Sequence, residues 1–288
     1  HSAQSRGAWE EAGEWLGESL RLRQQSGNEW MTQYSYYSLG SLEFDRGRVE
    51  RAIACFEAGL QIGRKYDDTR NCAIAQSELA EMLLQQGQDD RAAVLLQEGL
   101  AVGQGLGEKY IVRSCLIGMA TVARHAAQYE QAQGFLNESL RHAEVTNRHL
   151  RPGRVQHELA YVAALLGDDA QALALYQSSI VKWQECNQPL WVASALQGFA
   201  LLAVRSGQPE RALRLAAAAV ALRRAHGPAW GLDTDLYLSQ AEQTQWDRAI
   251  AAARTQLSEA RARCVWDEGQ AMTVEEAVHY AVGEMGKV

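Results

Sequence analysis

The chain has 288 residues, of which 47% are hydrophobic, so it is long and apolar enough to fold as a globular protein. Its 28 basic and 35 acidic residues give a net charge of −7, which disfavours direct binding to nucleic acid or to an anionic membrane. Prolines number only four, while Ala, Leu, Glu, Gln and Arg are abundant. These residues lose little on entering a helix, so the composition predicts an all-α protein.

The five cysteines and the absence of a targeting segment indicate the compartment. The cysteines form no CxxC motif and their odd number cannot pair completely, which predicts small, buried, reduced thiols. The sequence contains no apolar run near 18 residues and no signal-peptide pattern. We therefore expect a soluble, cytoplasmic protein.

The first predicted element, residues 1–29, is a single helix that corresponds to the second half of a repeat. Its apolar side chains include Trp9, Trp15, Leu16 and Leu20. Because the end of a repeat array normally carries a polar cap, we expect the native protein to continue upstream of this helix.

Five helical hairpins are predicted next, because one pattern recurs every 40 residues. GRVERA at 47–52 returns as GQDDRA at 87–92, AQYEQA at 127–132, GDDAQA at 167–172 and GQPERA at 207–212, and GAWEEA at 7–12 precedes them. A larger apolar residue follows each final alanine by four positions, except at Ala216, and a small residue follows by seven. These spacings mark one helix face, and the glycine marks a helix end. The predicted repeats, each a helix A, a turn and a helix B, are 30–69, 70–109, 110–149, 150–189 and 190–229.

The pattern loosens after Trp230. Two further helices are predicted, from Leu232 to Gln245 and from Asp247 to Cys264, as a degenerate sixth repeat over 230–264. Residues 265–288 are predicted to cap the array.

The hairpin pattern resembles the tetratricopeptide repeat. Positions 8, 20, 24 and 27 of that repeat carry a small residue, an alanine, an aromatic residue and a small residue. In this chain the corresponding residues are Gly40, Ala52, Phe56 and Gly59. The standard repeat has 34 residues rather than 40. The longer period is similar to the repeat region of bacterial signal-transduction ATPases with numerous domains, including large LuxR-type regulators and the activator of the maltose regulon. The resemblance implies an all-α, right-handed superhelical solenoid of antiparallel helix hairpins.

The segment 265–281 resembles the end of the repeat region in these regulators. The matching residues are Trp266, Glu268-Gly269, Ala271-Met272 and Thr273, followed by Glu275-Glu276-Ala277. Thr273 and Glu276 also have the spacing of a helix capping box. In the family this region follows a nucleotide-binding module and sometimes precedes a DNA-binding domain. No phosphate-binding loop motif occurs in this sequence, so the chain resembles the sensor or arm region alone.

Motifs for catalysis or metal binding are lacking. The sequence contains no HExxH and no G-x-S-x-G, and the glycines at 103–107 follow a predicted helix rather than a strand. We therefore expect no enzymatic activity, no cofactor and no metal site.

The resemblance implies that the A helices line a concave groove. With Gly40 as position 8, the inward positions are 2, 5, 9 and 12, and Tyr, Arg and His at such positions commonly anchor ligands. A cluster of Arg124, Arg154, His157 and Tyr161 would suit an anionic peptide or a carboxylate ligand. Tryptophans at the start of the A helices, such as Trp30 and Trp191, are predicted to pack between repeats. The candidate groove residues are Tyr34, Tyr37, Glu81, Arg124, Arg154, His157, Tyr161 and Gln197.

These features predict a non-catalytic sensor or arm region of a bacterial signalling or transcription regulator. It would bind a peptide, a protein or a small inducer in the groove and influence an upstream nucleotide-binding module. The alternative is a free-standing tetratricopeptide scaffold that grips a peptide of a partner protein.

Overall fold

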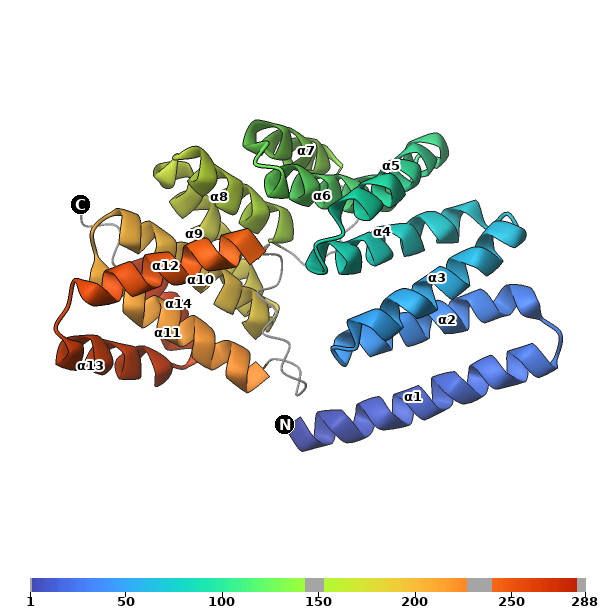
Figure 1. Ribbon diagram of the computed structural model, residues 1–288, viewed down its shortest axis with the longest axis horizontal. Coiled ribbons are helices and arrows are strands. Elements are labelled where there is room, and N and C mark those ends of the chain that lie inside the picture. Colours follow the sequence, from blue (N-terminus) through green and yellow to red (C-terminus); the bar gives the residue numbers. More distant parts are fainter. Residues whose placement is uncertain (1, 143–152, 227–239, 284–288) are drawn as a thin grey trace. The chain divides into compact units, whose positions relative to one another are not determined.

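A computed structural model describes residues 2–142, 153–226 and 240–283 (Figure 1). All regular secondary structure in these residues is α-helical, which confirms the predicted fold class. The helices form two compact units, α1–α6 and α8–α14, and the division runs through α7. The helices of the described residues are α1 (Ser2–Gln25), α2 (Glu29–Asp45), α3 (Val49–Lys65), α4 (Thr69–Gln85), α5 (Asp89–Leu106), α6 (Lys109–His125), α7 (Tyr129–Arg141), α8 (Arg154–Leu166), α9 (Asp169–Glu185), α10 (Pro189–Arg205), α11 (Pro209–His226), α12 (Gln240–Thr255), α13 (Glu259–Gln270) and α14 (Val274–Gly283).

Short turns join consecutive helices into antiparallel hairpins. Helix A packs against helix B in the pairs α2–α3, α4–α5, α8–α9 and α10–α11, and B helices also contact the next A helix, as in α3–α4 and α5–α6. Six of these helices have 17 residues and are followed by a three-residue joint, and α5 has 18 residues followed by two. This geometry gives a period of twenty residues per helix and forty per hairpin.

A residue with left-handed backbone conformation follows each of the helices α1–α6 and α8–α10. Its φ lies between 51° at Asn187 and 88° at Gly167. This conformation lets the amide after it close the helix, as where the N–H of Arg48 donates to the carbonyl of Glu43 at 2.8 Å. Two positions of this 20-residue series are exceptions. Position 147 lies outside the described residues, and Gly7 lies inside α1, which continues through it. The left-handed residues are Gly27, Gly47, Asp67, Gly87, Gly107, Ala127, Gly167, Asn187 and Gly207.

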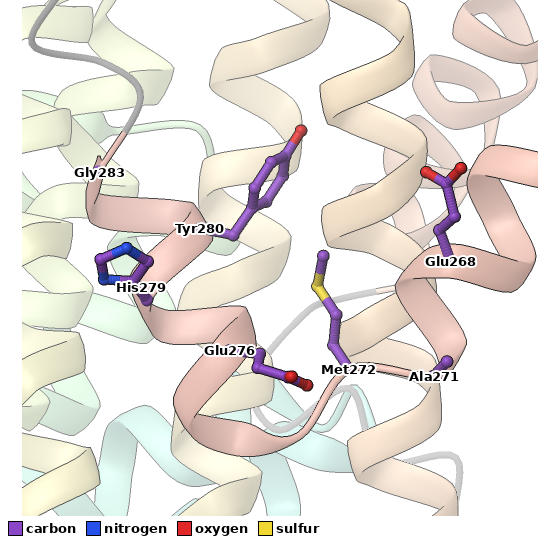
Figure 2. A pocket seen from close by; sticks show the side chains of 7 residues that line it. All are labelled: Glu268, Ala271, Met272, Glu276, His279, Tyr280 and Gly283. Carbon is purple, nitrogen blue, oxygen red and sulfur yellow. The ribbon is translucent and has the colours of Figure 1, made fainter.

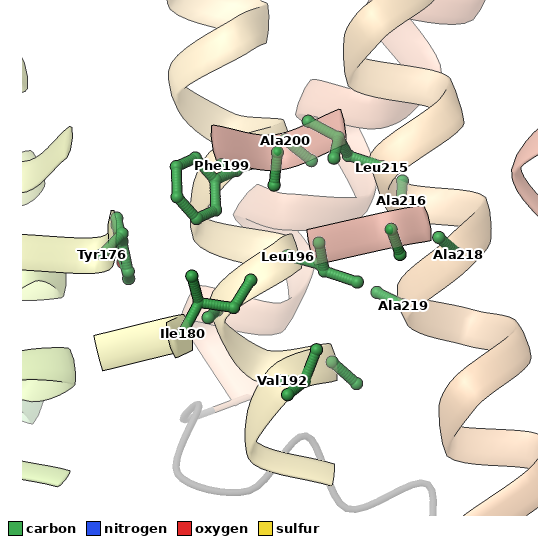
Figure 3. Close-up of a cluster of buried hydrophobic side chains, with 14 of the residues drawn as sticks. Tyr176, Ile180, Val192, Leu196, Phe199, Ala200, Leu215, Ala216, Ala218 and Ala219 are labelled. Carbon is green, nitrogen blue, oxygen red and sulfur yellow. The ribbon is translucent and has the colours of Figure 1, made fainter. Parts of the chain in front are cut away.

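The register alanines lie at the closest contacts between helices. Ala52, Ala92, Ala132, Ala172 and Ala212 are all 0% exposed, as the 40-residue pattern predicted. In the second unit, Tyr176 of α9 packs toward Phe199 of α10, and the small side chains of α11 fill the space beyond (Figure 3). A Cβ atom at Gly198 would lie 2.2 Å from the Tyr176 ring, so a glycine there makes room for the aromatic ring.

The α11 helix is buried on nearly every side. The small residues Ala216–Ala219 are fully buried because α10, α12, α13 and α14 all contact this helix. On α13, a Cβ atom at Gly269 would lie 2.3 Å from the carbonyl oxygen of Arg214. Alanine and glycine therefore permit a second layer of helices to approach the α11 backbone.

Two arginines of α11 hold the last helix. The Arg211 guanidinium donates to the carbonyls of Tyr280 and Ala281 at 3.2 and 2.9 Å. Arg214 Nη1 donates to the Tyr280 hydroxyl at 2.7 Å, and both guanidinium groups lie within 5.2 Å of the Tyr280 ring centre. Charged donors thus meet the carbonyl end of α14, where the helix dipole is negative.

The predicted capping box of α14 is present. The Thr273 hydroxyl accepts a hydrogen bond from the Glu276 amide at 3.2 Å, and the Glu276 carboxylate accepts one from the Thr273 amide at 2.8 Å. This reciprocal pair fixes where α14 begins.

The helix bounds predicted after Trp230 are wrong. Where a break was expected at residue 246, α12 runs without interruption to Thr255, and α13 extends to Gln270. The actual break is set by Ser258, whose hydroxyl accepts from the Arg261 amide at 3.3 Å and caps α13. Residues 232–239 lie outside the described residues. Among the described helices, none is both long and apolar enough to cross a membrane.

We predict that Ala127→Gly stabilises the protein. Ala127 has φ of 56°, a conformation that costs an L-residue about 1 kcal/mol but costs glycine little. Denaturant unfolding should show a gain of ~0.5–1 kcal/mol, whereas Gly87→Ala at the equivalent turn should show a loss. A loss in both variants would contradict this account.

We predict that Gly269→Ala destabilises the C-terminal helices. The new methyl would collide with the α11 backbone, which should cost about 1–3 kcal/mol. Gly105→Ala is the matched control, because a Cβ atom at this helical glycine meets nothing within 4 Å. Equal melting temperatures for the two variants would refute the close contact.

Candidate functional site

On the A helices of the first unit, α2, α4 and α6, position 6 is more exposed than position 5, which was predicted to face a ligand. Position 5 is buried on α4 and α6 and half-buried on α2, whereas position 6 carries the exposed Ser38 and the half-buried Glu78 and Gly118. On α8 and α10 both positions are buried. Position 5 turns inward because each A helix packs against two helices, its own B helix and the preceding one. On α2 and α4 the partly exposed residues therefore follow positions 2, 6 and 9, which share one helix face.

Tyr34 is half-buried at the start of the α2 face. Its hydroxyl donates to the Asp68 carboxylate at 2.8 Å and accepts from the Asn71 amide at 3.1 Å. The Trp30 ring meets the Tyr34 ring edge-on at 5.6 Å and is itself exposed, so the packing role predicted for this tryptophan is wrong. Burial acts to raise the pKa of Asp68, but hydrogen bonds from Tyr34 and Asn71 hold it below its usual value.

Tyr37 belongs to the packing between α2 and α3. Its ring stacks on Phe56 at 5.8 Å and 21°, and a Cβ atom at Gly59 would lie 2.4 Å from it. Burial raises the pKa of the Tyr37 hydroxyl far above its usual value. We conclude that Tyr37 supports the hairpin rather than presenting a polar group to a ligand.

The α4 face is acidic, and one of its acids was missed from the sequence. Glu81 is half-buried at position 9, and Glu78 lies one turn before it. Burial, with repulsion from Glu81, raises the pKa of Glu78 from 4.5 to about 7. The sequence did contain a signal for Glu78, because position 6, which it occupies, carries Ser, Glu or Gly in every hairpin instead of a large apolar residue.

The predicted basic cluster is divided between the two units. Arg124 lies on α6 of the first unit and is only 3% exposed, whereas Arg154, His157 and Tyr161 lie on α8 of the second. Its burial means that Arg124 cannot meet a ligand at the surface of the first unit without a change of conformation.

Aromatic side chains surround the α8 residues. The His157 ring is 8% exposed and lies edge-on to Tyr176 and Trp191, at 5.5 and 5.9 Å. The Arg154 guanidinium lies 5.9 Å from the Trp191 ring centre, and Trp191, fully buried as predicted, stacks on Trp183 at 4.8 Å. A cation over a packed tryptophan is held in place by the ring, so Arg154 presents an oriented charge.

The remaining predicted residues of the second unit differ in exposure. Tyr161 is half-buried and packs against the core cluster. Gln197 of α10 is buried, and its amide oxygen accepts a hydrogen bond from Arg223 of α11. Among the eight predicted residues, the partly exposed ones that remain candidates for ligand contact are Tyr34, Glu81, Arg154 and Tyr161.

A surface pocket lies where α13 meets α14 (Figure 2). Its lining includes Met272, Tyr280, Glu268 and Glu276. Both carboxylates already have structural partners, since Glu268 pairs with Arg214 and Glu276 caps α14. The pocket is therefore part of the anchoring of α14, and its acids are engaged there.

The cysteines differ in their exposure. Cys72 and Cys115 are buried thiols, whereas Cys186 and Cys264 are exposed. The prediction that all the cysteines are buried is therefore wrong. Within the described residues, no three His, Cys, Asp or Glu side chains lie together as a group that could hold a metal ion.

We predict that Glu78→Gln stabilises the protein at alkaline pH. Because the folded-state pKa lies above the unfolded value, ionisation of Glu78 opposes folding, and the penalty develops as pH rises from 4.5 to about 7. The variant should unfold at higher denaturant than wild type at pH 8 and at the same denaturant at pH 4. Glu14→Gln, at an exposed site on α1, is the control for the substitution itself. A gain at pH 4 as large as that at pH 8 would contradict the cause given.

Comparison with known proteins agrees with the hairpin architecture. Residues 32–105 match the tetratricopeptide repeat family. BtubC (BKLC) from P. vanneervenii is similar in structure, with a TM-score of 0.57 and 17% identity over 76% of this chain and 92% of that one. The Rap protein complexed with Competence and Sporulation Factor has a TM-score of 0.58 and 16% identity, over 86% and 74%. Curated protein sequences give no match. At these identities the structural likeness concerns the fold, and the chain contains a tetratricopeptide repeat region.

Proposed function

We propose that this chain is a non-catalytic binding module that captures a peptide or protein segment on the exposed face of its A helices. The observation that carries the proposal is that the oriented Arg154 and the half-buried Tyr161 lie seven residues apart on α8 and thus on one helix face. An arginine and a tyrosine together offer a charge, hydrogen bonds and a flat apolar surface. We therefore favour an anionic peptide as the ligand.

Fold likeness supports the proposal in general terms. The similar Rap structure is a complex with Competence and Sporulation Factor. Repeats of helical hairpins have extended surfaces on which successive A helices can each contact one part of a partner. On this chain Tyr34 and Glu81 lie on two A helices of the first unit, and Arg154 and Tyr161 lie together on one A helix of the second, α8, to which the proposed ligand is assigned.

We further propose that the module works as the sensor arm of a bacterial signalling or transcription regulator. The support is the segment 265–281, which resembles the end of the repeat region in such regulators, and whose glycine, capping box and Tyr280 anchor it on α11. The gene sequence upstream of His1 provides the test. A phosphate-binding loop encoded there would support the proposal, and a start codon followed directly by a polar capping helix would contradict it.

The ligand proposal predicts that Arg154→Ala weakens the binding of anionic peptides about tenfold, because a charge-assisted contact is lost. The probes are synthetic hexapeptides that are rich in Asp and Glu, uncharged, or rich in Lys, with affinity measured by fluorescence anisotropy on the full chain. Tyr161→Ala should also weaken binding. Arg248→Ala, at an exposed arginine of α12, is the control and should not. If both α8 variants bind the anionic peptide with wild-type affinity and have unchanged circular dichroism, the placement of the ligand on α8 is refuted.

A further inference from the structure

The first turn of α6 differs from the first turns of the two A helices before it. At α2 and α4 the N-cap side chains, Asn28 and Asp68, each accept a hydrogen bond from the amide of the third residue after them, at 3.3 and 3.4 Å. At α6 the N-cap residue is Glu108, whose side chain makes no such bond and pairs with Arg70 at 2.6 Å instead. The amides that open α6 therefore have no capping side chain, and such helix N-termini attract anions.

Two basic side chains lie on one face at this open end of α6. Lys109 is exposed, and Arg113 follows four residues later, so the two are neighbours on the helix surface. The first turn of α6 contains no acid. Among the described residues, neither Lys109 nor Arg113 has a hydrogen-bond or ion-pair partner. Like charges at this spacing repel each other, so a negative group bound between them would be favourable.

Arg113 is buried although it lacks an acceptor. Its side chain belongs to a residue that is only 7% exposed, and its Nε is fully buried without a hydrogen bond. The two terminal nitrogens are not among the fully buried atoms, so the tip of the guanidinium reaches the surface. An arginine stays charged at neutral pH, and a buried charge without a partner costs free energy. The missing acceptor is therefore a group that the described chain does not supply.

The Arg113 side chain extends toward the first turn of α6. Burial lowers the pKa of its guanidinium, and the nearby Tyr110 hydroxyl acts to raise it. Tyr110 lies one turn closer to the start of the helix, and long helical side chains generally lean in that direction. The guanidinium and the open amides are thus directed to the same end of α6.

The equivalent positions of other hairpins show that packing does not require a charge here. Position 1, which Arg113 occupies, carries Gln33 on α2, Ala73 on α4 and Ala193 on α10, and all three are 0% exposed. The Gln33 amide donates to the Asp68 carboxylate at 2.8 Å, so its polar group is satisfied within the chain. A neutral side chain fits this position in three hairpins, and the fold alone does not account for the arginine.

We propose that the first turn of α6 binds an oxyanion, the phosphate or carboxylate group of a ligand, through the Arg113 guanidinium, the Lys109 ammonium and the main-chain amides of that turn. Arginine donates two parallel hydrogen bonds to such groups, and the helix dipole adds to the attraction. The site lies in the first unit, whereas Arg154 lies in the second, so this site does not rest on the proposed peptide-binding face.

Inorganic phosphate is the probe for the experiment. Thermal unfolding of the full chain is followed by circular dichroism in a chloride buffer at neutral pH, and phosphate replaces chloride at constant ionic strength so that charge screening stays the same. A ligand that binds only the folded chain raises the melting temperature. We expect a rise that saturates with phosphate concentration. Acetate in a parallel series measures how well a carboxylate replaces phosphate.

Arg113→Met keeps a long apolar side chain without the charge. Without phosphate it should unfold at a higher temperature than wild type, because an unpaired buried charge has been removed. Its affinity for phosphate should fall about tenfold or more, since a charge-assisted contact is lost. Arg113→Lys keeps the charge but not the planar fork, and it should bind phosphate more weakly than wild type. Arg248→Met, at an exposed arginine of α12, is the matched control and should respond like wild type.

Arg154→Ala separates this site from the α8 face, because it should leave the response to phosphate unchanged. Three results would overturn the proposal. The first is a wild-type melting temperature that rises with neither phosphate nor acetate. The second is a wild-type response in either Arg113 variant. The third is a response that Arg154→Ala abolishes, which would assign the anion to α8.

Discussion

The left-handed joint at the end of each helix determines the rest of the structure. Because a helix of 17 residues is followed by a three-residue joint, every second helix presents the same positions to its neighbours. The alanines at 52, 92, 132, 172 and 212 consequently all reach a fully buried contact. Asp67, Ala127 and Asn187 adopt the joint conformation without being glycine, which shows that helix packing outweighs the local strain.

Small residues then decide where helices can form a second layer. The run Ala216–Ala219 departs from the large apolar residue found at the equivalent position of the other B helices, and the departure has a structural cause. With small side chains, α11 can be approached by α13 at Gly269 and by α14 near Arg211 and Arg214. The C-terminal segment is thus an integral part of the second unit.

Packing and binding compete for the same residue types on the A helices. Tyr37 and His157 are side chains that could grip a ligand, but their rings fill the spaces between helices. Arg154 and Tyr161 lie on the same helix as His157 and remain partly exposed. A shift of one residue around a helix changes the direction of a side chain by about 100°, which is enough to separate packing residues from surface residues.

The sequence by itself determined the helical hairpins, their 40-residue register and the capping box at Thr273, because turns, caps and buried small residues are local or periodic signals. It did not determine which of the positions 5 and 6 is the more exposed on α2, α4 and α6, since both are compatible with an amphipathic helix. Nor did it locate the break at Ser258, where the pattern is irregular, or reveal the unfavourable burial of Glu78. These features depend on neighbouring helices far away in the sequence, so only the tertiary structure decided them.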